Sequence, residues 1–257
     1  SQYDTSASVW CTIYLVKKIS IVIPALEEEL RLPNTLNSLN EFFSTNLLDY
    51  SKEVIIVVPD SKDRTYEIAK DFAGKFDTEY KVLQPGEKVG KGRDVRAGMH
   101  EATGDIVIFM DADLATPLHH LNKMVALLDK GTPIVIGIRQ IKTIHHSKLR
   151  SFVSLMGNLA SKFIVNVYYE DTQCGFKGFT KEATQICFGK QTITGWGFDI
   201  ELLAIAGVNQ LKVDTIVIED WDDVAGGSLN DSVMLSSFRT ITELLEIRAN
   251  IRKKLYS

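Results

Sequence analysis

Short apolar runs alternate with amphipathic stretches through the first 110 residues. The runs are rich in β-branched residues and show no polar alternation, which is typical of strands buried on both faces of a parallel sheet. The predicted strands are residues 19–24, 53–58, 80–83 and 105–110, and the predicted helices are residues 27–43, 63–72 and 95–102. This alternation predicts a doubly wound, mostly parallel α/β sheet with a Rossmann-like half.

The second half of the chain has a less regular pattern. Strands are predicted at 133–137 and 213–219, helices at 147–169, 193–206 and 233–255, and an extended or looped segment at 171–179. No internal repeat or low-complexity linker divides the sequence. We therefore expect one domain over the 257 residues.

Polar loops follow the strands of the first half. They contain Glu27-Glu28, residues 60–63, residues 88–93, and Asp111-Ala112-Asp113. Right-handed crossovers bring the carboxyl ends of parallel strands to one edge of the sheet, where ligands bind in open α/β folds. The sequence therefore predicts a ligand site at this edge.

Composition narrows the class of protein. A net charge of −4 and the lack of a basic stripe with interleaved aromatics argue against nucleic acid as a partner. Three cysteines suggest reduced thiols in a cytosolic compartment. No apolar run approaches the roughly 18–20 residues that span a bilayer. The pairs His119-His120 and His145-His146 have no zinc-type spacing with cysteine, and because neighbours on a helix diverge, we expect solvated histidines.

The Asp111-Ala112-Asp113 segment directly follows a buried strand. Two carboxylates at i and i+2 can converge on one hard cation, Mg²⁺ or Mn²⁺, through oxygen ligands. Such an ion neutralises charge on a leaving nucleoside diphosphate. Asp-x-Asp is a weak motif by itself, and its place at the end of a central strand beside other polar loops is what favours a metal site.

Four segments together resemble a known family. Ile21-Val-Ile-Pro-Ala-Leu-Glu-Glu28, Asp60-Ser-Lys-Asp-Arg-Thr65, Gly90-Lys-Gly92 and Asp111-Ala-Asp113 are similar in order and spacing to the family-2 GT-A glycosyltransferases. Asp171-Thr-Gln-Cys-Gly-Phe-Lys177 and the segment from Gly195 to Leu203 resemble the dolichyl-phosphate glucosyltransferase branch. The resemblance runs from about residue 19 to about residue 228. It implies a GT-A domain with an N-terminal extension (1–18), a nucleotide-sugar half (19–115), an acceptor half (116–228) and a C-terminal helix (229–257).

The resemblance also implies roles for matched positions. Donor contacts fall on Pro24, Ala25, Glu27, Glu28, Asp60, Asp63, Lys91, Asp111, Ala112 and Asp113, with the metal on Asp111 and Asp113. Acceptor contacts fall on Arg139, Arg150 and Trp196. The planar fork of arginine suits phosphate. Trp196 is interpreted as a residue that stacks on a sugar or packs in the core, and Cys174 as a packing residue.

Some positions depart from the family pattern. The loop at Pro59-Asp60-Ser61 is one residue shorter than usual, Arg93 and Asp94 replace small residues, and Leu229 stands where a lysine is common. Ala115 matches the glucosyl branch, so UDP-glucose is the expected donor by resemblance.

Family members typically invert the anomeric centre, and two carboxylates, Asp171 and Asp199, compete for the place beside it. Asp171 is favoured narrowly as the base or acceptor-orienting residue, since Asp199 can also cap the following helix. A phosphate monoester has a second pKa of about 6 and is already ionised at neutral pH. A lipid-phosphate acceptor, polyprenyl or dolichyl, therefore needs no strong base.

Residues 147–169 form a basic amphipathic stretch that suits either a membrane surface or the core. We expect a cytoplasmic protein with peripheral membrane contact at the cytosolic face. Three alternatives stay open: a glycosyltransferase acting on a sugar hydroxyl of a glycan or cell-surface polymer, a catalytically silent sugar-nucleotide-binding module, and a nucleotidyltransferase. The last lacks its glycine- and arginine-rich entry loop.

Overall fold

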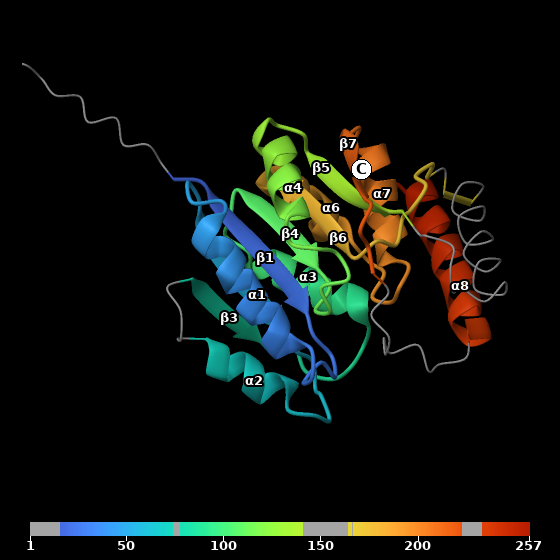
Figure 1. Cartoon of the computed structure of the whole chain (residues 1–257). Coiled ribbons are helices and arrows are strands. Elements are labelled where there is room, and N and C mark those ends of the chain that lie inside the picture. Colours follow the sequence, from blue (N-terminus) through green and yellow to red (C-terminus); the bar gives the residue numbers. More distant parts are fainter. Residues whose placement is uncertain (1–15, 74–77, 141–163, 166, 223–232) are drawn as a thin grey trace, which may run out of the picture.

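The computed structural model describes residues 16–73, 78–140, 164–165, 167–222 and 233–257. Its strands form one seven-stranded sheet in the order β3-β2-β1-β4-β6-β5-β7 (Figure 1). The strands are β1 Lys18–Pro24, β2 Ser51–Val57, β3 Glu79–Leu83, β4 Ile106–Met110, β5 Ile134–Arg139, β6 Phe176–Thr180 and β7 Val213–Ile218. The strand pairings in the described part of the chain are parallel except those of β6, which runs antiparallel to β4 and β5. The α/β prediction is confirmed.

Helices cover both faces of this sheet (Figure 1). They are α1 Leu32–Thr45, α2 Thr65–Phe72, α3 Lys91–Glu101, α4 His120–Asp129, α6 Lys181–Lys190, α7 Phe198–Val208 and α8 Val233–Arg252. Helices α1 and α4 pack on one face, whereas α3, α6, α7 and α8 lie on the other. None of the helices in the described part of the chain is long and apolar enough to span a bilayer.

The two faces have separate hydrophobic cores because strand side chains alternate. Ile21 and Ile23 of β1 belong to the cluster under α1 and α4, while Val22 between them belongs to the cluster under α3, α6 and α7. A strand buried on both faces is apolar at most of its positions. This is why Ile21-Val22-Ile23 of β1 shows an apolar run instead of alternation.

Several helix boundaries differ from the predictions. Helix α1 begins at Leu32, five residues later than expected, with Pro33 in its first turn, where proline is tolerated. Helix α3 begins at Lys91 instead of residue 95, and α7 begins at Phe198 instead of residue 193. Helices α4 and α6 were not predicted. The predicted helix at 147–169 lies largely outside the described residues, and residues 167–169 are not helical.

A buried acid ties the strands together at the edge opposite their carboxyl ends. Glu53 of β2 is fully buried and accepts hydrogen bonds from the Ser20 hydroxyl (2.5 Å) and from the Thr103 backbone and hydroxyl (2.6 and 2.9 Å). Lys18 lies 3.0 Å away. Burial opposes ionisation, but these hydrogen bonds outweigh it and lower the pKa of Glu53 to about 2.

Candidate active site

The loops after the parallel strands meet at one edge of the sheet. Because β6 runs antiparallel, the segment that enters it reaches the same edge as the ends of β4, β5 and β7. A pocket lies there. Its lining residues are Met110, Asp111, Asp113, Ala115, Thr116, Arg139, Gly175 and Trp221. They come from four separate parts of the chain, so the fold assembles the pocket.

Asp111 follows the last residue of β4 and is paired with a lysine. Its Oδ1 atom accepts a hydrogen bond from the Lys91 ammonium at 2.5 Å, and this ammonium lies 5.4 Å from the centre of the Trp196 ring. Burial disfavours the charge on Lys91, but Asp111 and Asp199 outweigh burial and raise its pKa. Lys91 therefore stays charged beside Asp111, at the start of α3.

Gly175 allows the Asp111 carboxylate to occupy its position. A Cβ atom at residue 175 would lie only 1.9 Å from Asp111 Oδ2. The backbones are also joined, since the Asp111 amide donates to the Gly175 carbonyl at 3.1 Å. Only glycine permits this close approach of the two strands. This glycine is part of the Asp-Thr-Gln-Cys-Gly-Phe-Lys motif, but the sequence alone does not indicate why glycine is required at this position.

Asp113 and Glu28 are two further carboxyl groups near Asp111. Asp113 Oδ1 accepts from the Ala115 amide at 3.0 Å, which fixes the turn after Asp111, while Ala112 is buried. Burial is the main cause that raises the pKa of Glu28, to about 7, with Arg31 opposing and the charges of Asp113 and Asp111 adding to the rise. An oxygen-rich, negatively charged group of this kind suits a hard divalent cation.

Arg139 and Asp171 form a two-point ion pair at the pocket wall. The Nε and Nη2 atoms of Arg139 donate to the two carboxylate oxygens of Asp171 at 2.6 and 2.9 Å. Burial alone would raise the pKa of Asp171, but the guanidinium outweighs burial and lowers it. Arg139 also lies 5.3 Å from the ring centre of Trp221. The predicted base and the predicted phosphate-binding arginine therefore bind each other.

Asp199 lies beneath the pocket in a buried ion pair. Lys177 donates to Asp199 Oδ1 at 2.5 Å and to the Cys174 carbonyl at 2.6 Å, and both charged side chains are essentially inaccessible. Burial raises the pKa of Asp199, although Lys177 and Lys91 partly oppose this. The pKa of the Cys174 thiol is raised to about 11 by burial, which agrees with the interpretation of Cys174 as a packing residue.

The first two loops lie at the carboxyl ends of β1 and β2. Pro24 ends β1, and the buried Ala25 donates its amide to the Val57 carbonyl at 2.9 Å. Glu27 is exposed and has a positive φ of 57°. One carboxylate oxygen of Asp63 accepts hydrogen bonds from the Thr65 amide (3.1 Å) and hydroxyl (2.7 Å), and the other oxygen accepts one from the Glu29 amide (3.1 Å). Asp63 therefore orders the start of α2, and Asp60 beside it is exposed.

Arg93, one of the departures from the family pattern, organises the loop before α3. Its guanidinium donates to the Pro85 carbonyl at 2.8 Å and to the Glu87 carbonyl at 2.5 Å. The glycine before Lys91 is required for packing, because a Cβ at Gly90 would lie 2.5 Å from the Thr194 carbonyl oxygen. The Gly-Lys-Gly segment thus brings Lys91 to the site by close backbone contact.

Trp196 belongs to an exposed loop that α8 holds in place. Its side chain is 51% exposed, so the ring is not part of the core and can contact a ligand. Glu243 of α8 accepts a hydrogen bond from the Gly197 amide at 2.7 Å, and a Cβ at Gly195 would lie 2.0 Å from the same carboxylate. Sequence reasoning found Trp196 but missed Glu243, because the two residues are far apart in the chain.

Four further residues of the site were not predicted as such: Gly175, Lys177, Trp221 and Glu243. Gly175 and Lys177 were present in the most specific motif without an assigned role, while nothing in the local pattern singled out Trp221 or Glu243. Arg150 and the segment at 227–229 lie outside the described residues.

The chain is similar in sequence to known glycosyltransferases. The model of glycosyl transferase family 2 matches residues 20–185. The dolichyl-phosphate beta-glucosyltransferase ALG5A of Trichomonas vaginalis is 33% identical over 240 residues, covering 89% of this chain and 72% of the relative. The dolichyl-phosphate beta-glucosyltransferase of Drosophila melanogaster is 32% identical over 226 residues, covering 82% and 69%.

A solved structure shares the fold. The Mycobacterium tuberculosis glucosyl-3-phosphoglycerate synthase, in complex with Mn²⁺, UDP-glucose and glycerol 3-phosphate, gives a TM-score of 0.68 at 18% identity, covering 91% of this chain and 80% of that one.

Proposed function

The chain belongs to glycosyl transferase family 2, and on this basis we propose that it transfers glucose from UDP-glucose to a dolichyl or other polyprenyl phosphate, with inversion. The curated relatives named above are dolichyl-phosphate beta-glucosyltransferases. The proposed donor half is 19–115, the acceptor half is 116–228, and residues 1–18 and 229–257 flank this single domain. Because the acceptor is a lipid, the enzyme works at a membrane surface through peripheral contact, at the cytosolic face.

One observation carries the choice of a phosphate acceptor over a hydroxyl. In the described part of the chain, each carboxylate expected beside the anomeric carbon is ion-paired: Asp171 with Arg139, and Asp199 with Lys177. Asp171 has a lowered pKa, which makes it a poor proton acceptor, and Asp199 is buried. A hydroxyl acceptor needs a general base, whereas a phosphate monoester brings its own oxyanion.

The residues around the pocket fit a divalent cation, Mg²⁺ or Mn²⁺. Asp111 and Asp113 line the pocket, and their charges add to the rise in the pKa of Glu28 that burial mainly causes. Bound there, the ion would neutralise the diphosphate of the leaving nucleotide. Lys91, already positioned against Asp111, would add a second positive charge on the same side.

The remaining side chains position the two substrates. Arg139 lines the pocket and has five N–H donors, of which two bind Asp171, so it can orient the acceptor phosphate. Trp196 offers an exposed ring near Lys91 for the sugar or the acceptor. In this arrangement catalysis rests on positioning and charge neutralisation.

Replacing Asp171 with Asn distinguishes the two acceptor classes. The rate of transfer to dolichyl phosphate should fall less than about tenfold, because only the orientation of Arg139 is disturbed. Loss of a general base costs about 10² to 10⁴. The matched control is Asp129→Asn, which removes an exposed pairing with Lys17 and should leave the rate unchanged.

The pH profile gives an independent readout. For a phosphate acceptor, log kcat/KM should rise to a plateau above about pH 6, the second pKa of a phosphate monoester, in both wild type and Asp171→Asn. A loss of about 10²-fold or more in the variant, or faster transfer to a glycan hydroxyl than to dolichyl phosphate, would refute the phosphate acceptor. Liposome flotation tests the membrane contact: no association with vesicles containing dolichyl phosphate, with or without anionic lipid, would contradict it.

A further inference from the structure

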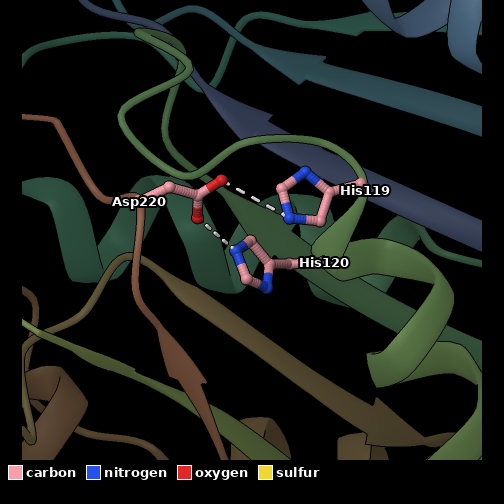
Figure 2. A group of neighbouring side chains, drawn as sticks. All are labelled: His119, His120 and Asp220. Carbon is pink, nitrogen blue, oxygen red and sulfur yellow. Dashed lines mark hydrogen bonds and ion pairs between the residues drawn. The ribbon is translucent and has the colours of Figure 1, made fainter.

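Two histidines and an aspartate form a cluster outside the proposed metal site. His119 is the residue before α4, His120 begins this helix, and Asp220 follows β7 closely. His120 Nε2 lies 2.6 Å from Asp220 Oδ1, and His119 Nε2 lies 3.5 Å from Asp220 Oδ2. Figure 2 shows both rings turned toward the carboxylate. One ligand atom from each residue lies within 4.8 Å of the other two.

This arrangement overturns the expectation of a solvated histidine for His120, whereas His119 is exposed and His145-His146 lies outside the described residues. His120 is buried, and the two ring centres lie 4.2 Å apart. Adjacent helical residues do diverge in direction, but Asp220 arrives from another element and both imidazoles reach it. Since the third partner is 100 residues away along the chain, no local spacing could reveal the cluster.

The ligand set differs in kind from that of Asp111 and Asp113. Two imidazole nitrogens and one carboxylate suit Zn²⁺ and neighbouring transition metals, whereas carboxylates alone suit Mg²⁺ and Mn²⁺. His119 and Asp220 are 62% and 49% exposed, so an ion can enter and a water molecule can complete its shell.

The distances are compatible with one ion. Metal–ligand bonds of about 2.0–2.1 Å in a tetrahedral shell separate the ligand atoms by roughly 3.4 Å. His119 Nε2 lies 3.5 Å from Asp220 Oδ2, His120 Nε2 lies 2.6 Å from the other oxygen, Oδ1, and one ligand atom from each residue lies within 4.8 Å of the others, so side-chain movements of roughly 1 Å bring the three residues onto one ion. Bonds to the metal replace the hydrogen bond between His120 Nε2 and Asp220, with the ring proton of His120 on Nδ1.

We propose that His119, His120 and Asp220 bind one zinc-class transition-metal ion at a site distinct from the Asp111/Asp113 centre. The ion links the start of α4 to the segment after β7. Both segments adjoin the pocket, because Thr116, three residues before His119, and Trp221, next to Asp220, line it. A bound ion would therefore fix the pocket wall that carries Trp221.

The test uses the full chain without a histidine tag and with Cys11→Ser, which removes a thiol that could compete for the metal. Bound metal is first removed from this protein with a chelator. Zn²⁺ is titrated by calorimetry, and Co²⁺ by its visible absorption, in the absence of nucleotide. We expect one site per chain, and at least tenfold weaker binding in His119→Ala and in Asp220→Asn. His119 is exposed, so its removal should leave the circular dichroism spectrum and melting temperature of the metal-free protein unchanged.

Two controls separate this site from others. His100→Ala, on α3, removes a histidine outside the cluster and should bind Zn²⁺ like the parent. Asp111→Asn should also keep Zn²⁺ binding, even where it abolishes the response to Mn²⁺ and UDP. Equal Zn²⁺ affinity in the parent and His119→Ala, or no binding in either, would overturn the proposal and leave the cluster as a hydrogen-bonded tie. This outcome does not depend on whether the chain transfers glucose.

Discussion

Gly175→Ala gives the sharpest test of the geometry around Asp111. The added methyl group would lie 1.9 Å from Asp111 Oδ2 and 2.3 Å from its Cγ, whereas real Cβ atoms essentially never approach another atom within 3.0 Å. The carboxylate must therefore move by at least about 1 Å, or the two strands must separate. Either change disturbs the hydrogen bond between Asp111 and Lys91.

The expected loss of activity follows from this displacement. A misplacement of about 1 Å in a positioning group can cost about 10²-fold in rate. We expect kcat/KM for glucose transfer from UDP-glucose to dolichyl phosphate to fall about 100-fold in Gly175→Ala. The affinity for Mn²⁺ in the presence of UDP, followed by electron paramagnetic resonance, should fall as well, which ties the effect to Asp111 and not to the acceptor.

The matched control is Gly207→Ala in α7, where a Cβ atom meets nothing within 4 Å. Alanine is favoured over glycine in a helix by about 0.5–1 kcal/mol, so this variant should be slightly more stable and fully active. Unchanged kcat/KM together with unchanged Mn²⁺ affinity in Gly175→Ala would refute the reasoning, since Asp111 would then tolerate displacement without consequence.

Three further predictions concern stability, each measured by urea denaturation. Lys177→Met leaves Asp199 as an uncompensated buried charge and should lower the free energy of unfolding by about 3–5 kcal/mol. The double variant Lys177→Met/Asp199→Asn, which has neither charge, should recover at least about 1 kcal/mol of this loss. Equal stability of the single and double variants would count against the Lys177–Asp199 ion pair. The pKa of Glu53 is about 2 in the folded state and 4.5 in the unfolded state. This difference stabilises the folded state by about 3 kcal/mol; the stabilisation is complete above about pH 5 and is lost as the pH falls toward 2. Glu53→Gln should therefore lose stability at pH 7 and show a weaker acid dependence than wild type; parallel pH curves would contradict this. Tyr256→Phe removes the buried hydrogen bond to Glu201 (2.6 Å) and should cost about 1–3 kcal/mol, and a neutral result would show that this bond adds nothing to the C-terminal packing.

The sequence by itself determined the central strands and the positions of their polar ends. Residues 19–24, 53–58 and 105–110 were predicted because a strand covered on both faces is apolar at most of its positions, which is a local pattern. The place of Asp111 and Asp113 followed from the strand before them. The motifs from Ile21 to Lys177 also carried the family, which the family model and the relatives confirm.

The tertiary structure alone decided which charges neutralise one another and which elements meet. The pairs Arg139–Asp171 and Lys177–Asp199 form because antiparallel β6 returns between β4 and β5. Asp220 meets the two histidines at the start of α4 only because β7 lies beside β5 at the end of the sheet. Helix α6 escaped prediction because its buried face is made partly of small and polar residues, such as Ala183 and Thr184. Such contacts depend on strand order and backbone approach, which a local pattern of apolar positions does not encode.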